Sequence, residues 1–195
     1  DKEIITMPNW CENEVDITGD YEQLKELMTE ASKPNLSFDN GESKPKFLMD
    51  NLVPVPKELL EGDGWYRWRL DNWGTKWDLN QDYDDTRVDY EEGDTEAGLT
   101  YQTAWSSNRE FWLTVSKRFP KLVIDLRYLE EGMWFMGQEL YKGGEIIASV
   151  YHNDIPDDIC VKAGAVFGED GEIDWDNSDI HLWSVFPLIK WKELV

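Results

Sequence analysis

Twice along the chain, a stretch that alternates between apolar and polar residues leads directly into a stretch with helical spacing. In residues 11–18 the apolar side chains fall at every second position, and in residues 20–32 they fall three and four positions apart. The same change occurs between residues 99–105 and 107–119. Alternation is typical of a strand with one wet face, and the wider spacing is typical of an amphipathic helix. The sequence therefore predicts two strand-helix units.

Local signals mark the ends of both predicted helices. Asp20 is placed to cap the first helix, and Pro34 lies beyond its end. Ser107, followed three residues later by Glu110, has the spacing of a capping box, and Pro120 stops the second helix. We therefore expect Ser107 to be the N-cap of the second helix.

The order of these segments predicts an α+β fold of the ferredoxin-like kind, in which two helices cover one face of an antiparallel sheet. A further alternating strand occupies residues 122–128, and residues 133–151 indicate a hairpin that adds strands. We expect the domain to span residues 1–151, with a long insertion, residues 33–85, after the first helix. We expect residues 152–195 to form a C-terminal extension that packs on the same domain.

The chain is strongly acidic. It has 195 residues, with 41 Asp and Glu against 19 Lys and Arg, and a formal net charge of −22. Such a charge repels phosphate backbones and anionic membranes, which argues against direct nucleic-acid or membrane binding. A protein with a basic surface would instead be attracted. The other interpretation is that the acidity serves only to keep the protein in solution.

The acidity peaks in residues 78–96, and the densest cluster of acidic side chains lies in residues 82–96. If the charge attracts a basic protein partner, this cluster is the expected contact surface, because clustered charge steers association. Such a surface would imitate nucleic acid in a basic groove. The candidate partner-binding residues are Asp84, Asp85, Asp89, Glu91, Glu92 and Asp94.

Neither a membrane span nor a disulfide framework is indicated. No apolar run reaches 18 residues, no segment has the pattern of a signal peptide, and the two cysteines are Cys11 and Cys160. The cytoplasm is therefore the expected compartment. With His152 and His181, these cysteines lack the spacing of zinc ligands. Phosphate-binding glycine loops and serine-hydrolase patterns are also missing, so we expect a non-enzymatic protein without a cofactor.

A compact tryptophan motif lies in the middle of the chain. It runs from Trp73 to Trp77 and contains Gly74 and Lys76. Gly74 permits a tight turn, the two rings would pin that turn to the core, and the Lys76 ammonium would lie over a ring. We interpret the motif as structural and expect both rings to be mostly buried, together with Trp105 and Trp112.

Two other interpretations use the same region. Tryptophans beside carboxylates are typical of sugar-handling sites, and the residues available for one are Trp65, Trp68, Asp71, Trp73 and Asp78. Oxygen ligands at alternate positions are typical of a calcium loop, which would use Asp78, Asn80, Asp82, Asp84 and Asp89. Tyr83 occupies the position where that loop requires glycine, which disfavours calcium.

Several short strings occur together in one order. They are residues 8–13 (Pro-Asn-Trp-Cys-Glu-Asn), 51–54 (Asn-Leu-Val-Pro), 72–77 (Asn-Trp-Gly-Thr-Lys-Trp), 103–106 (Thr-Ala-Trp-Ser) and 131–132 (Glu-Gly). In this order the chain resembles the YubB-type family of phage and plasmid proteins over residues 7–140. The resemblance implies a ferredoxin-like domain, a mobile-element accessory protein, and Met7 as an alternative start. It carries over no catalytic residue.

The favoured hypothesis is therefore a non-enzymatic phage- or plasmid-encoded accessory protein that binds a protein partner with a basic surface. A sugar-binding or glycoside-processing protein and a calcium-stabilised structural module are the alternatives.

Overall fold

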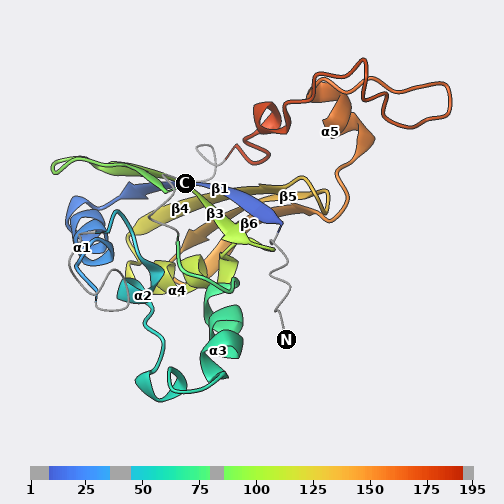
Figure 1. Cartoon of the computed structure of the whole chain (residues 1–195). Coiled ribbons are helices and arrows are strands. Elements are labelled where there is room, and N and C mark those ends of the chain that lie inside the picture. The colour runs from blue at the N-terminus through green and yellow to red at the C-terminus, as the bar shows by residue number, and fades with distance from the viewer. Residues whose placement is uncertain (1–8, 36–44, 80–85, 191–195) are drawn as a thin grey trace.

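A computed structural model of the chain describes residues 9–35, 45–79 and 86–190. Its centre is a six-stranded antiparallel sheet with the strand order β2-β3-β1-β4-β5-β6 (Figure 1). The strands are β1 (Trp10–Gly19), β2 (Arg87–Asp89), β3 (Glu96–Ala104), β4 (Leu122–Glu130), β5 (Phe135–Lys142) and β6 (Glu145–His152). The α-helices are α1 (Tyr21–Ala31), α2 (Met49–Leu52), α3 (Gly64–Trp73), α4 (Arg109–Arg118) and α5 (Asp157–Lys162), and the 3-10 helices are η2 (Lys57–Leu59) and η3 (Leu182–Val185).

The first four strands have the predicted ferredoxin-like connections. β1 leads through α1 to β2 and β3, and α4 leads to β4. In the sheet β1 lies between β3 and β4 and is antiparallel to both. β5 and β6 extend the sheet beyond β4 as the predicted hairpin. The α+β prediction is confirmed.

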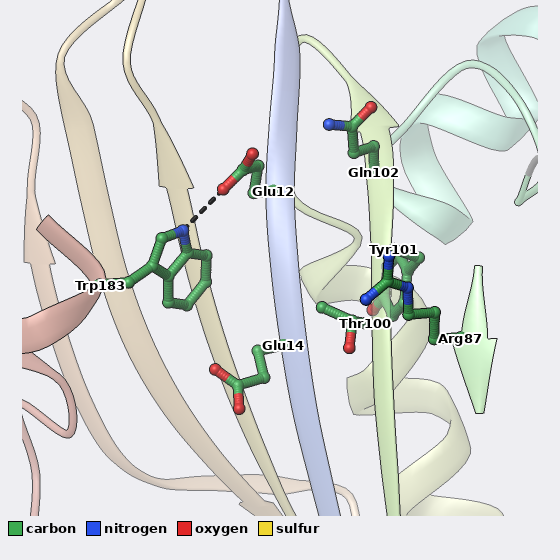
Figure 2. A pocket seen from close by; sticks show the side chains of 7 residues that line it. All are labelled: Glu12, Glu14, Arg87, Thr100, Tyr101, Gln102 and Trp183. Atoms are coloured by element: carbon green, nitrogen blue, oxygen red, sulfur yellow. Dashed lines mark hydrogen bonds between the residues drawn. The ribbon is translucent and has the colours of Figure 1, made fainter. Parts of the chain in front are cut away.

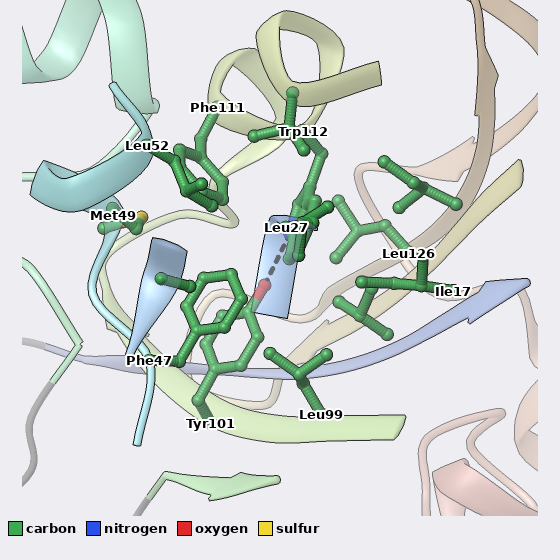
Figure 3. Packing of buried hydrophobic residues seen from close by; sticks show 14 of the residues in the cluster. Ile17, Leu27, Phe47, Met49, Leu52, Leu99, Tyr101, Phe111, Trp112 and Leu126 are labelled. Carbon is green, nitrogen blue, oxygen red and sulfur yellow. Dashed lines mark hydrogen bonds between the residues drawn. The ribbon is translucent and has the colours of Figure 1, made fainter. Parts of the chain in front are cut away.

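The two main helices cover the same face of the sheet. Leu27 of α1 and Trp112 of α4 belong to one buried cluster with Tyr101 of β3 (Figure 3). The Trp112 indole N–H donates to the Tyr101 hydroxyl at 2.7 Å, and this hydroxyl donates to Asn108 at 2.7 Å. The expected burial of Trp112 and Trp73 is confirmed, because neither side chain has exposed surface.

One predicted helix cap is correct and the other is wrong. The Asp20 carboxylate accepts a hydrogen bond from the backbone N–H of Gln23 at 3.2 Å, which caps α1. The N-cap of α4 is Asn108 rather than Ser107, and Asn108 makes no capping bond because its side chain accepts from Tyr101 in the core. The buried Ser107 hydroxyl has no hydrogen-bond partner in the described part of the chain.

The C-terminal extension lies on the sheet face opposite α1 and α4. A second buried cluster joins Leu129 of β4 and Met136 of β5 to Ile159 of α5 and Leu182 of η3. Both sheet residues belong to the set of side chains that point away from the main core. Figure 1 shows α5 beyond one end of the sheet, with the chain then returning toward the strands.

Candidate functional site

A row of carboxylates lies on the sheet face that the main helices leave uncovered. Along β1, Glu12, Glu14 and Asp16 alternate with the buried Asn13 and Val15, so they point away from α1 and α4. Strand geometry spaces such alternate side chains about 6.6 Å apart. This row forms the open face together with residues of β2, β3 and β4 that lie on the same side of the sheet, which are Arg87, Asp89, Glu96, Thr100, Gln102 and Arg127.

The strand register assembles the open face in rows that cross the sheet. Glu14 pairs with Arg127 of β4 on one side and Thr100 of β3 on the other, and Thr100 pairs with Arg87 of β2. The next row contains Asp125, Asp16, Gly98 and Asp89. Because adjacent strands lie about 4.8 Å apart, charged groups from β4, β1 and β2 meet on one small surface.

Arg127 neutralises only part of the carboxylate row. Its guanidinium lies 3.5 Å from Glu14 and also pairs with Asp16. Within the described residues no lysine or arginine lies at ion-pair distance from Glu12, which instead accepts a 2.6 Å hydrogen bond from the indole N–H of Trp183. One guanidinium therefore pairs with two of the three carboxylates, and the row keeps a negative charge.

A pocket of about 410 Å³ lies over this row (Figure 2). The C-terminal extension supplies one of its walls through Trp183 of η3, and β1 supplies Glu12 and Glu14. The opposite wall includes Arg87, and the remaining lining residues are Thr100, Tyr101 and Gln102. The pocket thus combines an aromatic ring, carboxylates and a guanidinium.

A second, more acidic groove continues the open face toward the turn between β2 and β3. Its volume is about 500 Å³. The charged residues that line it are Asp16, Asp89, Asp94 and Glu96. With no basic residue in its lining, this groove would attract a cationic group.

The four described residues of the predicted partner-binding set lie on β2 and in the turn that follows it. Asp89 and Asp94 line the acidic groove. Glu92 forms an ion pair with Lys25 of α1 at 2.5 Å. Glu91 is exposed in the turn, where its backbone N–H donates to Asp94. The other two, Asp84 and Asp85, lie outside the described residues.

In the tryptophan motif, Gly74 and Lys76 have the geometry that the structural interpretation expects. Gly74 ends α3 with φ at +80°, a left-handed conformation that favours glycine. The Lys76 ammonium lies 4.5 Å from the centroid of the Trp77 ring. The Ser106 hydroxyl donates to the Gly74 carbonyl at 2.6 Å, which ties the motif to the turn after β3.

The expected burial of Trp77 and Trp105 is wrong. These side chains are 36% and 43% exposed. Trp77 lies past the end of α3 and packs against Trp10, which is itself exposed, with ring centroids 6.1 Å apart. Trp105 lies in the turn after β3, where the alternation that buries every second strand residue has ended.

Asp78 is a structural acid in this fold. Its carboxylate accepts hydrogen bonds from the backbone N–H groups of Met49 at 2.8 Å, Asp50 at 3.0 Å and Leu79 at 2.7 Å. Burial raises the pKa of this carboxyl to about 6, although the three donors act in the opposite direction. Asp78 therefore holds the start of α2.

Among the described residues, the candidates of the calcium and sugar interpretations do not form an open site. Trp68 packs edge-on against the buried Trp73, with ring centroids 6.0 Å apart. Asp89 lies on the open face, apart from Asp78, and the intervening template positions Asn80, Asp82 and Asp84 lie outside the described residues. Trp73 is fully buried, and its indole N–H donates to the Val53 carbonyl at 2.9 Å. In the described part of the chain, no three metal-ligating side chains form a cluster that could hold an ion.

The cysteines show no sign of a reactive role. Cys11 and Cys160 are both buried and free. Burial raises the pKa of both thiols, which disfavours the nucleophilic thiolate. Cys11 faces the main core with Val15 and Ile17, as its position in the alternation indicates.

The sequence analysis does not predict the open face as a binding site, although the alternation in β1 is a signal for part of it. The alternation that predicts β1 already assigns Glu12, Glu14 and Asp16 to its wet face. No local signal connects Trp183 to them, because it joins the row from 171 positions away.

These features define a ferredoxin-like α+β domain with an acidic, partly enclosed sheet face. Residues 72–160 match the family model described as the ferredoxin-like domain in Api92-like protein. The crystal structure of a protein api92 from Yersinia pseudotuberculosis is similar, with a TM-score of 0.50 and 10% identity over 76% of this chain and 99% of that chain. At this identity the likeness shows the fold alone. No curated protein matches the chain.

The match to the family model confirms a ferredoxin-like domain, which the sequence resemblance also implies. The model describes this domain in Api92-like protein. The YubB-type assignment stays a prediction. Among the described residues, no helix is both long and apolar enough to cross a bilayer.

Proposed function

We propose that the protein is a non-enzymatic binding protein whose open face receives the basic surface of a protein partner. The observation that carries this proposal is the row of Glu12, Glu14 and Asp16 on the side of β1 that α1 and α4 leave uncovered. Arg127 pairs with two of these carboxylates and leaves Glu12 without a cation in the described structure. An incompletely neutralised row attracts lysine and arginine side chains.

The shape of this surface supports a protein partner that normally holds nucleic acid. A strand places its alternate carboxylates in a straight line at about 6.6 Å intervals, which presents regularly spaced negative charge to a basic groove. The net charge of −22 would speed the approach of such a partner and repel nucleic acid itself.

The biological setting is proposed on the resemblance to YubB-type proteins. On that basis the protein is an accessory factor of a phage or plasmid, and its partner is encoded by the host or by the element. The cytoplasm is the proposed compartment, because Cys11 and Cys160 are free and the fold uses no disulfide between them.

The test compares two variants of equal net charge. In the face variant, Glu12→Gln, Glu14→Gln and Asp16→Asn neutralise the row. In the control variant, Glu→Gln changes remove three exposed charges elsewhere, at Glu22, Glu26 and Glu61. A partner captured by the tagged wild-type protein from its native host, and identified by mass spectrometry, is then used as a purified probe.

The expected result is an association rate about tenfold lower for the face variant at low salt, with the difference shrinking near roughly 0.5 M salt. The control variant should stay within about twofold of the wild type. Equal rates for the two variants at every salt concentration would contradict the proposal and leave solubility as the role of the charge. Displacement of the protein by a DNA duplex would support the imitation of nucleic acid.

A further inference from the structure

We propose that the pocket between Trp183 and β1 binds an arginine side chain of the partner. This inference rests on the proposed function and specifies which chemical group the open face recognises. Three elements far apart in the sequence supply the pocket: β1, the β2–β3 pair and the C-terminal extension.

Trp183 is held in a defined position at this pocket. Its indole N–H donates to Glu12 at 2.6 Å, and its ring packs against Phe186 with centroids 5.0 Å apart. The ring also lines the pocket beside Glu14 (Figure 2). A cation on an indole face and within reach of two carboxylates gains attraction from both kinds of group.

The lining favours a guanidinium over an ammonium. A guanidinium is planar, stacks on aromatic faces, and offers five N–H donors to carboxylate oxygens in a fixed fork. The side-chain oxygens of Thr100 and Gln102 lie in the same pocket and can accept further N–H groups. An ammonium is more strongly hydrated and cannot stack in this way.

Arg87 makes the two sides of the pocket differ in charge. It lies on the wall away from Trp183, two strands from β1, and within the described residues no carboxylate lies at ion-pair distance from it. Its charge repels a second cation and attracts an anion. The pocket therefore suits an arginine with an acidic neighbour better than an unbroken run of arginines.

The test uses short peptides as probes. Acetyl-Gly-Arg-Gly-amide is compared with the citrulline peptide, which has nearly the same shape without the charge, and with the lysine peptide. Binding is followed by NMR through the indole N–H signal of Trp183, assigned from the spectrum of Trp183→Leu. We expect the arginine peptide to bind at least fivefold more tightly than either analogue.

Variants of the protein test whether the carboxylate charge of Glu12, rather than its hydrogen bond to Trp183, binds the arginine. Glu12→Gln keeps an oxygen that accepts the indole N–H but removes the charge, so arginine affinity should fall about fivefold while the fold is retained. Glu22→Gln on α1 is the matched control and should change nothing. Acetyl-Gly-Arg-Asp-Gly-amide should bind more tightly than acetyl-Gly-Arg-Arg-Gly-amide, and Arg87→Gln should abolish or reverse this order.

Equal binding of the arginine and citrulline peptides, or an unchanged affinity in Glu12→Gln, would overturn the inference. The proposed function is tested separately by the association rates of the captured partner. If those rates depend on the carboxylate row while the peptides show no preference, the face binds the partner without an arginine pocket.

Discussion

The indole N–H of Trp183 donates to Oε2 of Glu12 at 2.6 Å and joins the C-terminal extension to the first strand across 171 positions of sequence. This contact makes the extension part of the candidate site, because it places an aromatic ring beside the carboxylate row. A second contact holds the same segment: the backbone N–H of Ile189 donates to the Gln138 side chain of β5 at 2.7 Å.

Removing the indole donor should loosen the extension. Trp183→Phe retains a ring but loses the hydrogen bond to Glu12, so we expect the free energy of unfolding to fall by about 0.5–1.5 kcal/mol. Hydrogen exchange should also quicken at Ile189. Trp175→Phe is the control, since Trp175 is 65% exposed and should tolerate the change. An identical effect of both substitutions would show that the Glu12 contact contributes nothing.

Tyr101 should be more important to stability than its ring alone suggests. Its hydroxyl accepts from Trp112 and donates to Asn108, both at 2.7 Å within the core. Tyr101→Phe leaves these two buried groups without that partner, so we expect a loss of about 1–3 kcal/mol in urea unfolding. Tyr151→Phe, at an exposed position on β6, should change stability by less than about 0.5 kcal/mol.

Two adjacent serines should respond differently to truncation. The Ser106 hydroxyl donates to the Gly74 carbonyl at 2.6 Å, whereas the buried Ser107 hydroxyl has no partner among the described residues. We expect Ser106→Ala to cost about 1–2 kcal/mol and Ser107→Ala to be neutral or slightly stabilising. Thermal unfolding of the two variants measures the difference. A larger loss of stability in Ser107→Ala than in Ser106→Ala would contradict this prediction and indicate that Ser107 caps α4.

Asp78 should make the protein less stable as the pH rises from about 4 to 6. Its pKa is raised from 3.8 to about 6 in the folded protein, so the folded state holds the proton more tightly than the unfolded chain. Asp78 contributes its full stabilisation to the folded state below about pH 4 and none above about pH 6. The free energy of unfolding therefore falls by about 2–3 kcal/mol over this range.

Asp78→Asn should remove this part of the pH dependence. Urea unfolding of the wild type and the variant at several pH values isolates it from the other carboxylates, and Asp63→Asn, at an exposed position, is the control. Parallel stability curves for the wild type and Asp78→Asn would show that Asp78 ionises normally.

The acidic turn should contribute unequally to partner association. Asp89 and Asp94 line the groove on the open face, whereas Glu92 is paired with Lys25. Asp89→Asn with Asp94→Asn should therefore slow association at low salt by about threefold or more, and Glu91→Gln with Glu92→Gln should have a smaller effect. The two double variants have the same net charge, so equal slowing would indicate that only total charge matters.

The main strands and helices follow from local patterns in the sequence. The alternation around Val15 and the helical spacing after Asp20 are local patterns, and local patterns decide which face of an element is apolar. The same alternation places Glu14 and Asp16 on the wet side of β1. The ferredoxin-like order followed, because few arrangements bury both helices on one sheet.

Which polar and aromatic groups meet depends on how the folded chain packs. The side chain of Asn108, the N-cap of α4, accepts from Tyr101 in the core and makes no capping bond. Trp77 is exposed and packs against the exposed Trp10. Trp183 reaches Glu12 only after the extension folds back over the sheet. These contacts depend on strand order and register, which a periodic pattern does not contain, because it records the face of a residue and not its neighbour across the sheet.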